Sequence, residues 1–152
     1  MSAPPPANLD AHLGYWLRMV SNAVSQSFAR KVEREGVTVA EWVFLRALYD
    51  VEPVAPSLLA EKMGMTKGAI SKLADRLIDK DLVERQPNRD DRRAHLVVLT
   101  DAGRPLVPRL AALADENDAA FFGALSTDDR DRLARLLRTI AGNRGLAVAP
   151  VD

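Results

Sequence analysis

Basic side chains gather in the middle of the chain, within residues 62–93. This stretch holds nine Lys and Arg residues against six Asp and Glu, although the whole chain carries 21 of each and has no formal net charge. The nine are Lys62, Lys67, Lys72, Arg76, Lys80, Arg85, Arg89, Arg92 and Arg93. Clustered cations can neutralise phosphates, so this part of the chain favours a nucleic-acid partner.

Acidic side chains gather in a second stretch, residues 115–131, where Arg130 is the one base. The six carboxylates are Asp115, Glu116, Asp118, Asp128, Asp129 and Asp131. Such a cluster could suggest a metal site, but its helical setting favours a solvated face. We therefore expect no metal, and a molecule whose zero net charge hides a basic and an acidic pole.

The basic stretch contains an amphipathic helix pattern. Thr66 is a suitable N-cap, and the residues after it place an apolar stripe on one face of a helix over 67–80. A shorter helix over 57–63 and a turn at Gly64 precede it, which predicts a helix-turn-helix. The opposite face carries Lys67, Ser71, Lys72, Asp75 and Arg76. The residues of this segment that we expect to contact DNA are Thr66, Lys67, Gly68, Ser71, Lys72 and Arg76.

Hydroxyl and cationic side chains near the start of such a helix can reach base edges in the major groove, and Gly68 would allow a close backbone approach. A solvated helix face of no special function would carry similar residues. The helix alone leaves both interpretations open.

Two short strands are predicted next, at 82–85 and 95–99, joined by a polar loop over 87–94. The loop holds Arg89, Arg92 and Arg93 and has little apolar surface to pack. Arginine at such a tip suits a narrow minor groove, and we expect Asp91 to brace one guanidinium through a bidentate pair. The alternative is a solvated turn with internal ion pairs.

Long helices flank this central region. Apolar residues three and four apart predict helices over 10–35, 100–122 and 126–142, and their stripes need cover from the rest of the domain or from a second copy. Thr38 and Glu41 predict a capping box that starts another helix, in which each residue bonds to the other's amide. That helix should end near Asp50.

Composition excludes several classes of protein. A chain of 152 residues with 47% hydrophobic and 28% charged residues is ordinary for one soluble domain. The absence of cysteine excludes disulfides, thiolate zinc sites, iron–sulfur clusters and thiol redox sensing. No apolar run reaches a membrane span and no signal-peptide pattern follows Met1, so we expect a cytoplasmic protein with no membrane partner.

Catalytic patterns are also missing from the sequence. His12 and His95 are far apart, and there is no Gly-rich phosphate loop or nucleophile elbow. We therefore expect neither an enzyme nor a cofactor.

One stretch carries a family resemblance. Residues 59–103 read LAEKMGMTKGAISKLADRLIDKDLVERQPNRDDRRAHLVVLTDAG, with DRR at 91–93 followed by LVVLTDAG. This stretch resembles the MarR family of bacterial winged-helix repressors, and the helix order fits from about Leu9 to Arg144. Asn88 and Asp90 depart from the Asp and Arg that the family often has there, which alters the charge of the outer wing.

The resemblance implies a mainly α fold with a small β-hairpin wing: a winged helix-turn-helix with long N- and C-terminal dimerisation helices. It divides the chain into a flexible arm (1–8), dimerisation helices (9–36 and 100–144), a winged helix-turn-helix DNA-binding lobe (37–99) and a flexible tail (145–152). It further implies a homodimer that binds double-stranded DNA at pseudo-palindromic operators and regulates transcription, as a repressor in our interpretation.

The resemblance also implies a small, anionic aromatic effector, bound between the dimerisation helices and the DNA-binding lobe. The side chains we would expect there are His12, Trp16, Arg18, Met19 and Trp42, with Arg18 as the anion partner. A structural role in the core or at the dimer seam is the competing interpretation.

A second function from a different class stays open: a winged-helix module that binds an acidic protein and never contacts DNA. Binding to random duplex DNA would separate the two, because several phosphate contacts predict a steep loss of affinity as salt rises.

Overall fold

The computed structural model describes residues 1–149 and 151, and within them the chain is mainly helical with one antiparallel hairpin. This confirms the predicted fold class. The elements in chain order are a short 3-10 helix, η1 (Leu9–Ala11), then α1 (Leu13–Glu33), α2 (Val39–Tyr49), α3 (Pro56–Met63), α4 (Lys67–Asp79), β1 (Val83–Asn88), β2 (Asp91–Leu99), α5 (Gly103–Phe122) and α6 (Thr127–Asn143).

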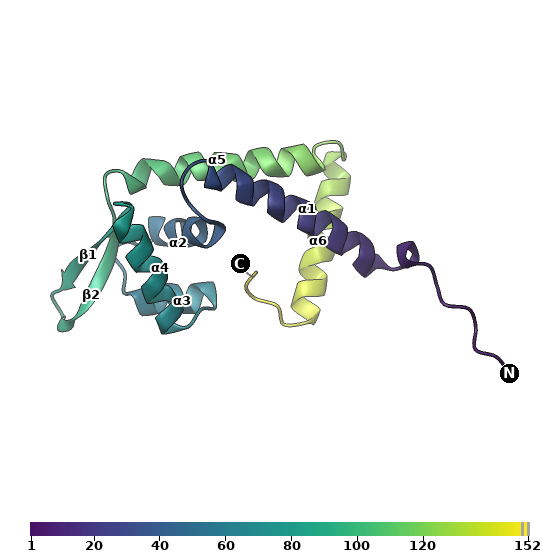
Figure 1. Cartoon of the computed structure of the whole chain (residues 1–152), viewed down its shortest axis with the longest axis horizontal. Helices are drawn as coiled ribbons and strands as arrows, with labels where there is room; N and C mark the ends of the chain where they lie inside the picture. The colour runs from purple at the N-terminus through teal and green to yellow at the C-terminus, as the bar shows by residue number, and fades with distance from the viewer. Residues whose placement is uncertain (150, 152) are drawn as a thin grey trace.

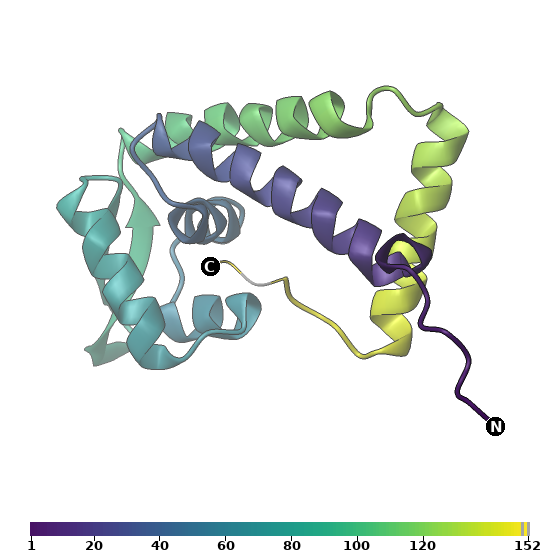
Figure 2. The same ribbon diagram turned by 45° about the vertical axis from the view of Figure 1, so that its right-hand side comes forward.

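The helices form an arch (Figure 1). Helices α1 and α5 lie side by side, the lobe of α2, α3, α4 and the hairpin descends from one end, and α6 descends from the other (Figures 1 and 2). The core lies inside the lobe and at its junction with α5, where Phe44, Leu73, Val97 and Leu110 are almost fully buried. By contrast, α6 has no buried residue. The packed core therefore positions the lobe, while α6 is left without cover.

The predicted first helix is wrong at its start. Residues 9–11 form the separate turn η1, His12 is extended with φ −100° and ψ 128°, and α1 begins only at Leu13. The indole Nε1 of Trp16 donates to the carbonyl of Asp10 at 2.8 Å. This bond satisfies a carbonyl that a continuous helix would have bonded through its backbone, so the break is locally stabilised.

The predicted start of α2 is half right. Thr38 Oγ1 accepts from the backbone N–H of Glu41 at 3.1 Å, as expected of the cap. The reciprocal bond from Glu41 does not form, because its carboxylate turns inward and Oε2 accepts from Lys80 Nζ at 2.7 Å. A partner distant in the sequence has replaced the local amide.

Helix α5 begins at Gly103 rather than at Thr100. The Thr100 hydroxyl accepts from the N–H of Gly103 at 3.0 Å and donates to the carbonyl of Asp81 at 2.7 Å. A Cβ on Gly103 would lie 2.0 Å from the carbonyl oxygen of Leu82. The lack of a side chain at Gly103 thus lets the start of α5 sit directly on the segment that leaves α4.

The ends of the chain have less structure. Residues 1–8 form no helix or strand and are exposed. At the other end, Gly145 (φ 66°) ends α6 and the chain turns back until Val148 lies 3.7 Å from where a Cβ on Gly64 would be. The expected tail reaches to residue 152, and its residues 150 and 152 lie outside the described residues. No helix in the described part of the chain is both long and apolar enough to span a membrane.

Candidate nucleic-acid interface

The position of α4 is set by its cap and by its buried stripe. Gly64 takes the left-handed conformation (φ 63°) that ends α3, and Thr66 Oγ1 then accepts from the N–H of Ala69 at 3.1 Å to start α4. Ile70, Leu73 and Leu77 are at most 1% exposed. With these side chains fixed in the core, the opposite face of α4 is held toward solvent.

That opposite face carries every residue of this segment predicted to contact DNA. All six residues are exposed: Thr66, Lys67, Gly68, Ser71, Lys72 and Arg76. A Cβ on Gly68 would meet no atom within 4 Å, so the backbone there is open to an approaching surface. The structure brings these residues together on one cationic face.

The hairpin differs from its prediction. The strands extend to Asn88 and from Asp91, so only Arg89 and Asp90 form the turn, and Arg92 and Arg93 belong to β2 rather than to a loop. The register is Pro87 to His95 and then Asn88 to Asp91, which leaves 92–94 as extra residues on β2. Side-chain acceptors support this irregular end, since Asn88 Oδ1 accepts from the N–H of Asp90 at 3.0 Å.

The expected bidentate pair of Asp91 with an arginine is also wrong. Asp91 Oδ1 accepts from the backbone N–H of Arg93 at 3.0 Å, so the carboxylate holds the chain and not a guanidinium. Arg89, Arg92 and Arg93 are all exposed and make no ion pair within residues 1–149 and 151. The end of the hairpin therefore presents three unneutralised cations.

The two cationic elements lie side by side. The β1–β2 turn and the N-terminal end of α4 sit at the same end of the lobe in both views (Figures 1 and 2). An ion pair between Arg85 of β1 and Asp75 of α4 connects them directly. Helix and hairpin can consequently meet one extended surface at the same time.

Two of the nine basic residues are exposed but already have an acidic partner within the chain. Lys80 is paired with Glu41, and Arg85 with Asp75. The other seven make no ion pair in the described part of the chain. The pairs were missed because they join residues 39 and 10 positions apart in different elements, and no local spacing signals them.

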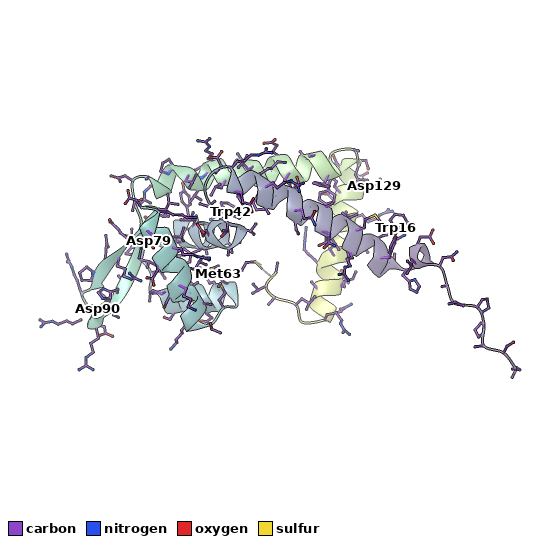
Figure 3. The ribbon with its side chains drawn as sticks, viewed as in Figure 1. Trp16, Trp42, Met63, Asp79, Asp90 and Asp129 are labelled. Carbon is purple, nitrogen blue, oxygen red and sulfur yellow. The ribbon has the colours of Figure 1, made fainter. Side chains whose placement is uncertain are left out.

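The residues expected to hold an effector do not form one site within the chain. Trp16 lies on the far part of α1 and Trp42 lies in α2, well apart (Figure 3). His12, Trp16, Arg18 and Met19 are all exposed, whereas Trp42 is half-buried with its ring edge against Phe28 at a centroid distance of 6.4 Å.

Trp42 instead lines a hollow of about 320 Å³ between α2 and α3. The other lining residues are Val43, Arg46, Ala47, Asp50, Val51 and Lys62. Arg46 Nη1 lies 2.6 Å from Asp50 Oδ2, so one of the two cations here is already paired. Arg46 and Asp50 were not singled out from the sequence, although their four-residue spacing on the helix of Trp42 was a usable signal.

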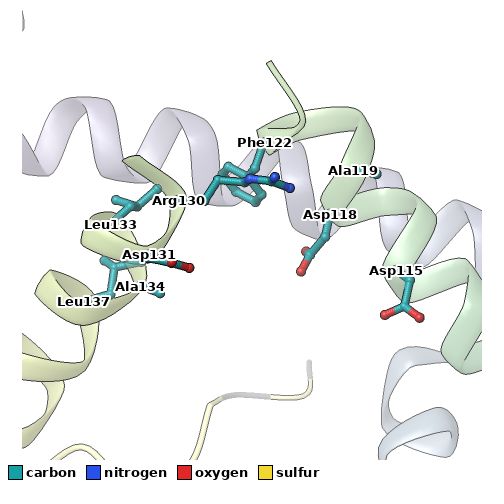
Figure 4. A pocket seen from close by; sticks show the side chains of 9 residues that line it. All are labelled: Asp115, Asp118, Ala119, Phe122, Arg130, Asp131, Leu133, Ala134 and Leu137. Carbon is teal, nitrogen blue, oxygen red and sulfur yellow. The ribbon is translucent and has the colours of Figure 1, made fainter. Parts of the chain in front are cut away.

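A larger groove of about 490 Å³ lies between α5 and α6 (Figure 4). Phe122, Leu133 and Leu137 give it an apolar wall, and Asp115, Asp118 and Asp131 lie along it with Arg130. Among the described residues, no three metal-ligating side chains are grouped closely enough to hold an ion. The groove continues the uncovered apolar face of α6.

Comparison with known proteins was made on both sequence and structure. A model of the MarR family matches residues 35–94. A probable transcriptional regulator from Pseudomonas aeruginosa is 28% identical, with a TM-score of 0.74 over 88% of this chain and 99% of that one. A mutant MarR from E. coli complexed with operator DNA is 26% identical, with a TM-score of 0.74 over 84% and 92%.

A third similar structure concerns regulation by a small molecule. It is BpsR from Bordetella bronchiseptica, a protein whose DNA binding is regulated by 6-hydroxynicotinic acid. It is 25% identical to this chain, with a TM-score of 0.75 over 90% of this chain and 98% of that one.

Proposed function

We propose that this chain, which a MarR-family model matches over residues 35–94 and which is similar to solved transcriptional regulators, is a sequence-specific repressor of that family and not an enzyme. In this proposal it binds pseudo-palindromic operators as a homodimer, with residues 37–99 as the DNA-binding lobe and with 9–36 and 100–144 as the dimerisation helices.

The observation that carries the proposal is the shared exposed end of α4 and the hairpin (Figures 1 and 2). A helix fits the major groove, and an arginine-bearing tip beside it can enter the adjacent minor groove. On α4 the proposed contacts are Thr66, Lys67, Gly68, Ser71, Lys72 and Arg76. On the hairpin they are Arg89, Arg92 and Arg93, with Asp91 holding the strand end.

The homodimer is supported by apolar surface that the single chain leaves uncovered. In α1, Leu13 is 88% exposed and Leu17 53%, and in α6, Leu136 is 53% and Ile140 54% exposed. Patches of this kind mark an interface. A two-fold dimer would place the two copies of α4 in major grooves about one helical turn, roughly 34 Å, apart.

A small, anionic aromatic effector belongs to the same proposal. The hollow beside Trp42 offers an aromatic wall and the cation Lys62, and the similar BpsR is regulated by an aromatic acid. The expected contributions of His12, Trp16, Arg18 and Met19 would require a site that the single chain does not assemble. Trp42 is therefore the candidate that the structure favours.

The test is selection of bound duplexes from a random-sequence library, followed by affinity measurements across salt concentrations. We expect enrichment of a sequence with two related half-sites and a steep linear fall of log affinity with log salt. No enrichment and a flat salt response would contradict the proposal and favour a module that binds an acidic protein. Release of the selected duplex by 6-hydroxynicotinic acid, and its loss in Trp42→Ala, would test the effector.

A further inference from the structure

Lys80 is the C-cap residue of α4, and its side chain connects this end of the helix to the rest of the chain. Lys80 Nζ donates to Glu41 Oε2 at 2.7 Å and to the carbonyl of Gly36 at 2.8 Å. Glu41 lies in the first turn of α2, and Gly36 lies in the turn between α1 and α2. One amino group thus joins α4 to two parts of the chain some forty residues earlier.

The burial of Glu41 explains why its carboxylate needs a cationic partner. Glu41 is 1% exposed, and a carboxylate removed from water is costly unless a cation or hydrogen-bond donors compensate it. Lys80 Nζ is the cation that reaches it. Although Lys80 lies in the basic stretch and 39% of its side chain is exposed, its amino group is already bonded to Glu41 and Gly36 and is not free to neutralise a phosphate.

The same end of α4 is clamped from a second side. Asp81 takes a left-handed conformation (φ 59°), and its carbonyl accepts from the Thr100 hydroxyl at 2.7 Å. The N–H of Thr100 donates to the carbonyl of Leu82 at 3.1 Å, directly before α5 begins. The end of α4 is therefore fixed between the start of α2 and the start of α5.

These contacts act at the C-terminal end of α4, so a small change of angle there is amplified along the helix. Helix α4 has 13 residues, which corresponds to about 20 Å, and its DNA-facing residues concentrate toward the other end. A tilt of about 5° about the clamp would move that other end by nearly 2 Å, which is enough to break hydrogen bonds to base edges.

We infer that Lys80 is a positioning residue for sequence reading, one that contacts no DNA itself and sets the angle at which α4 presents Lys67, Ser71 and Lys72. The inference rests on the proposed function. It differs from a phosphate contact in a measurable way, because a phosphate contact contributes to all DNA sequences and to the salt slope, whereas positioning affects the selected sequence alone.

The experiment compares four variants with the wild type on the selected duplex and on a scrambled duplex of the same composition. Glu41→Gln/Lys80→Met removes both charges, so no unpaired carboxylate is left to unfold the lobe. Lys80→Arg keeps a cation, and Lys72→Met removes an exposed lysine from the same helix. Lys31→Met removes a half-buried lysine from α1, whose amino group donates to Ser27 Oγ. Thermal unfolding and circular dichroism verify that each variant folds.

We expect Glu41→Gln/Lys80→Met to bind the selected duplex about tenfold more weakly, the scale of one lost base contact. Its affinity for the scrambled duplex and its salt slope should stay as in the wild type. Lys80→Arg should retain selective binding, and Lys31→Met should have no effect. Lys72→Met should lower the salt slope by about 0.9.

Two results would overturn the inference while leaving the proposed function intact. Equal weakening on both duplexes with a reduced salt slope would make Lys80 a phosphate contact, and unchanged selectivity in the double variant would remove it from DNA reading. If the wild-type chain itself enriches no sequence, the proposed function fails and the inference fails with it.

Discussion

Asp91 Oδ1 accepts a hydrogen bond from the backbone N–H of Arg93 at 3.0 Å, two residues along the same strand. The carboxylate thus acts as an acceptor that shapes the end of the hairpin, and its charge is not used to hold an arginine side chain. Charge and hydrogen bonding can be separated here, because asparagine keeps an Oδ1 acceptor and loses the charge.

We predict that Asp91→Asn keeps operator affinity within about twofold, since the geometry of the strand end is retained. Asp91→Ala should weaken binding by roughly three- to tenfold, in line with a net hydrogen bond of about 1 kcal/mol. Fluorescence anisotropy on the selected duplex measures both. Equal losses in the two variants would show that the charge of Asp91 matters, as the sequence first suggested.

Arg92 and Arg93 are exposed and unpaired within the described residues, so removing them should leave the fold intact. Arg92→Ala and Arg93→Ala should each lower operator affinity and reduce the salt slope by about 0.9 if each neutralises one phosphate. Arg34→Ala, an exposed arginine at the end of α1, is the matched control. Unchanged affinity in both hairpin variants would exclude the wing from DNA binding.

Local signals predicted α4 well, and they failed where a distant partner intervened. The Thr66 cap and the stripe of Ile70, Leu73 and Leu77 are written in adjacent residues, and the structure bears them out. Glu41 also fits a local capping pattern, but its carboxylate pairs with Lys80, 39 residues away. No spacing rule in one sequence identifies such a pair.

The lengths of the two hairpin strands were underpredicted for a different reason. Strand prediction depends on alternation between buried and exposed residues, but from Glu84 to Pro87 β1 is continuously exposed. Its backbone ladder forms without that pattern, so charged strand residues were read as a loop. The uncovered face of α6 could be anticipated from its leucines, whereas the separation of Trp16 from Trp42 depends on how α1 and α2 pack.

Gly68 lies in the first turn of α4 with open space around its Cα. Gly68→Ala should stabilise the protein by about 0.5–1 kcal/mol, because alanine favours the helix and meets no obstruction. The same methyl group should weaken operator binding if the backbone approaches DNA closely. Thermal unfolding and anisotropy together test this, and a variant that is more stable with unchanged affinity would exclude a close approach at Gly68.

Gly103 should show the opposite response to the same substitution. A Cβ there would lie 2.0 Å from the carbonyl oxygen of Leu82, which is backbone and cannot move aside freely. Gly103→Ala should therefore destabilise the protein by roughly 1–3 kcal/mol. Gly142→Ala, where a Cβ meets nothing within 4 Å, is the control. Equal melting temperatures for Gly103→Ala and the wild type would mean that the α4–β1 connection yields easily.

Leu137 lines the groove between α5 and α6 and is 42% exposed in the single chain, on a helix with no buried residue. In the proposed homodimer this side chain would be covered by the partner, so Leu137→Asp would bury an unpaired charge at the seam. We predict a shift from dimer to monomer in sedimentation velocity, with the helical content retained because the lobe has its own core. Thr139→Asp adds the same charge away from the leucine stripe and should stay dimeric. A Leu137→Asp protein that remains dimeric at low micromolar concentration would show that α6 does not form the seam.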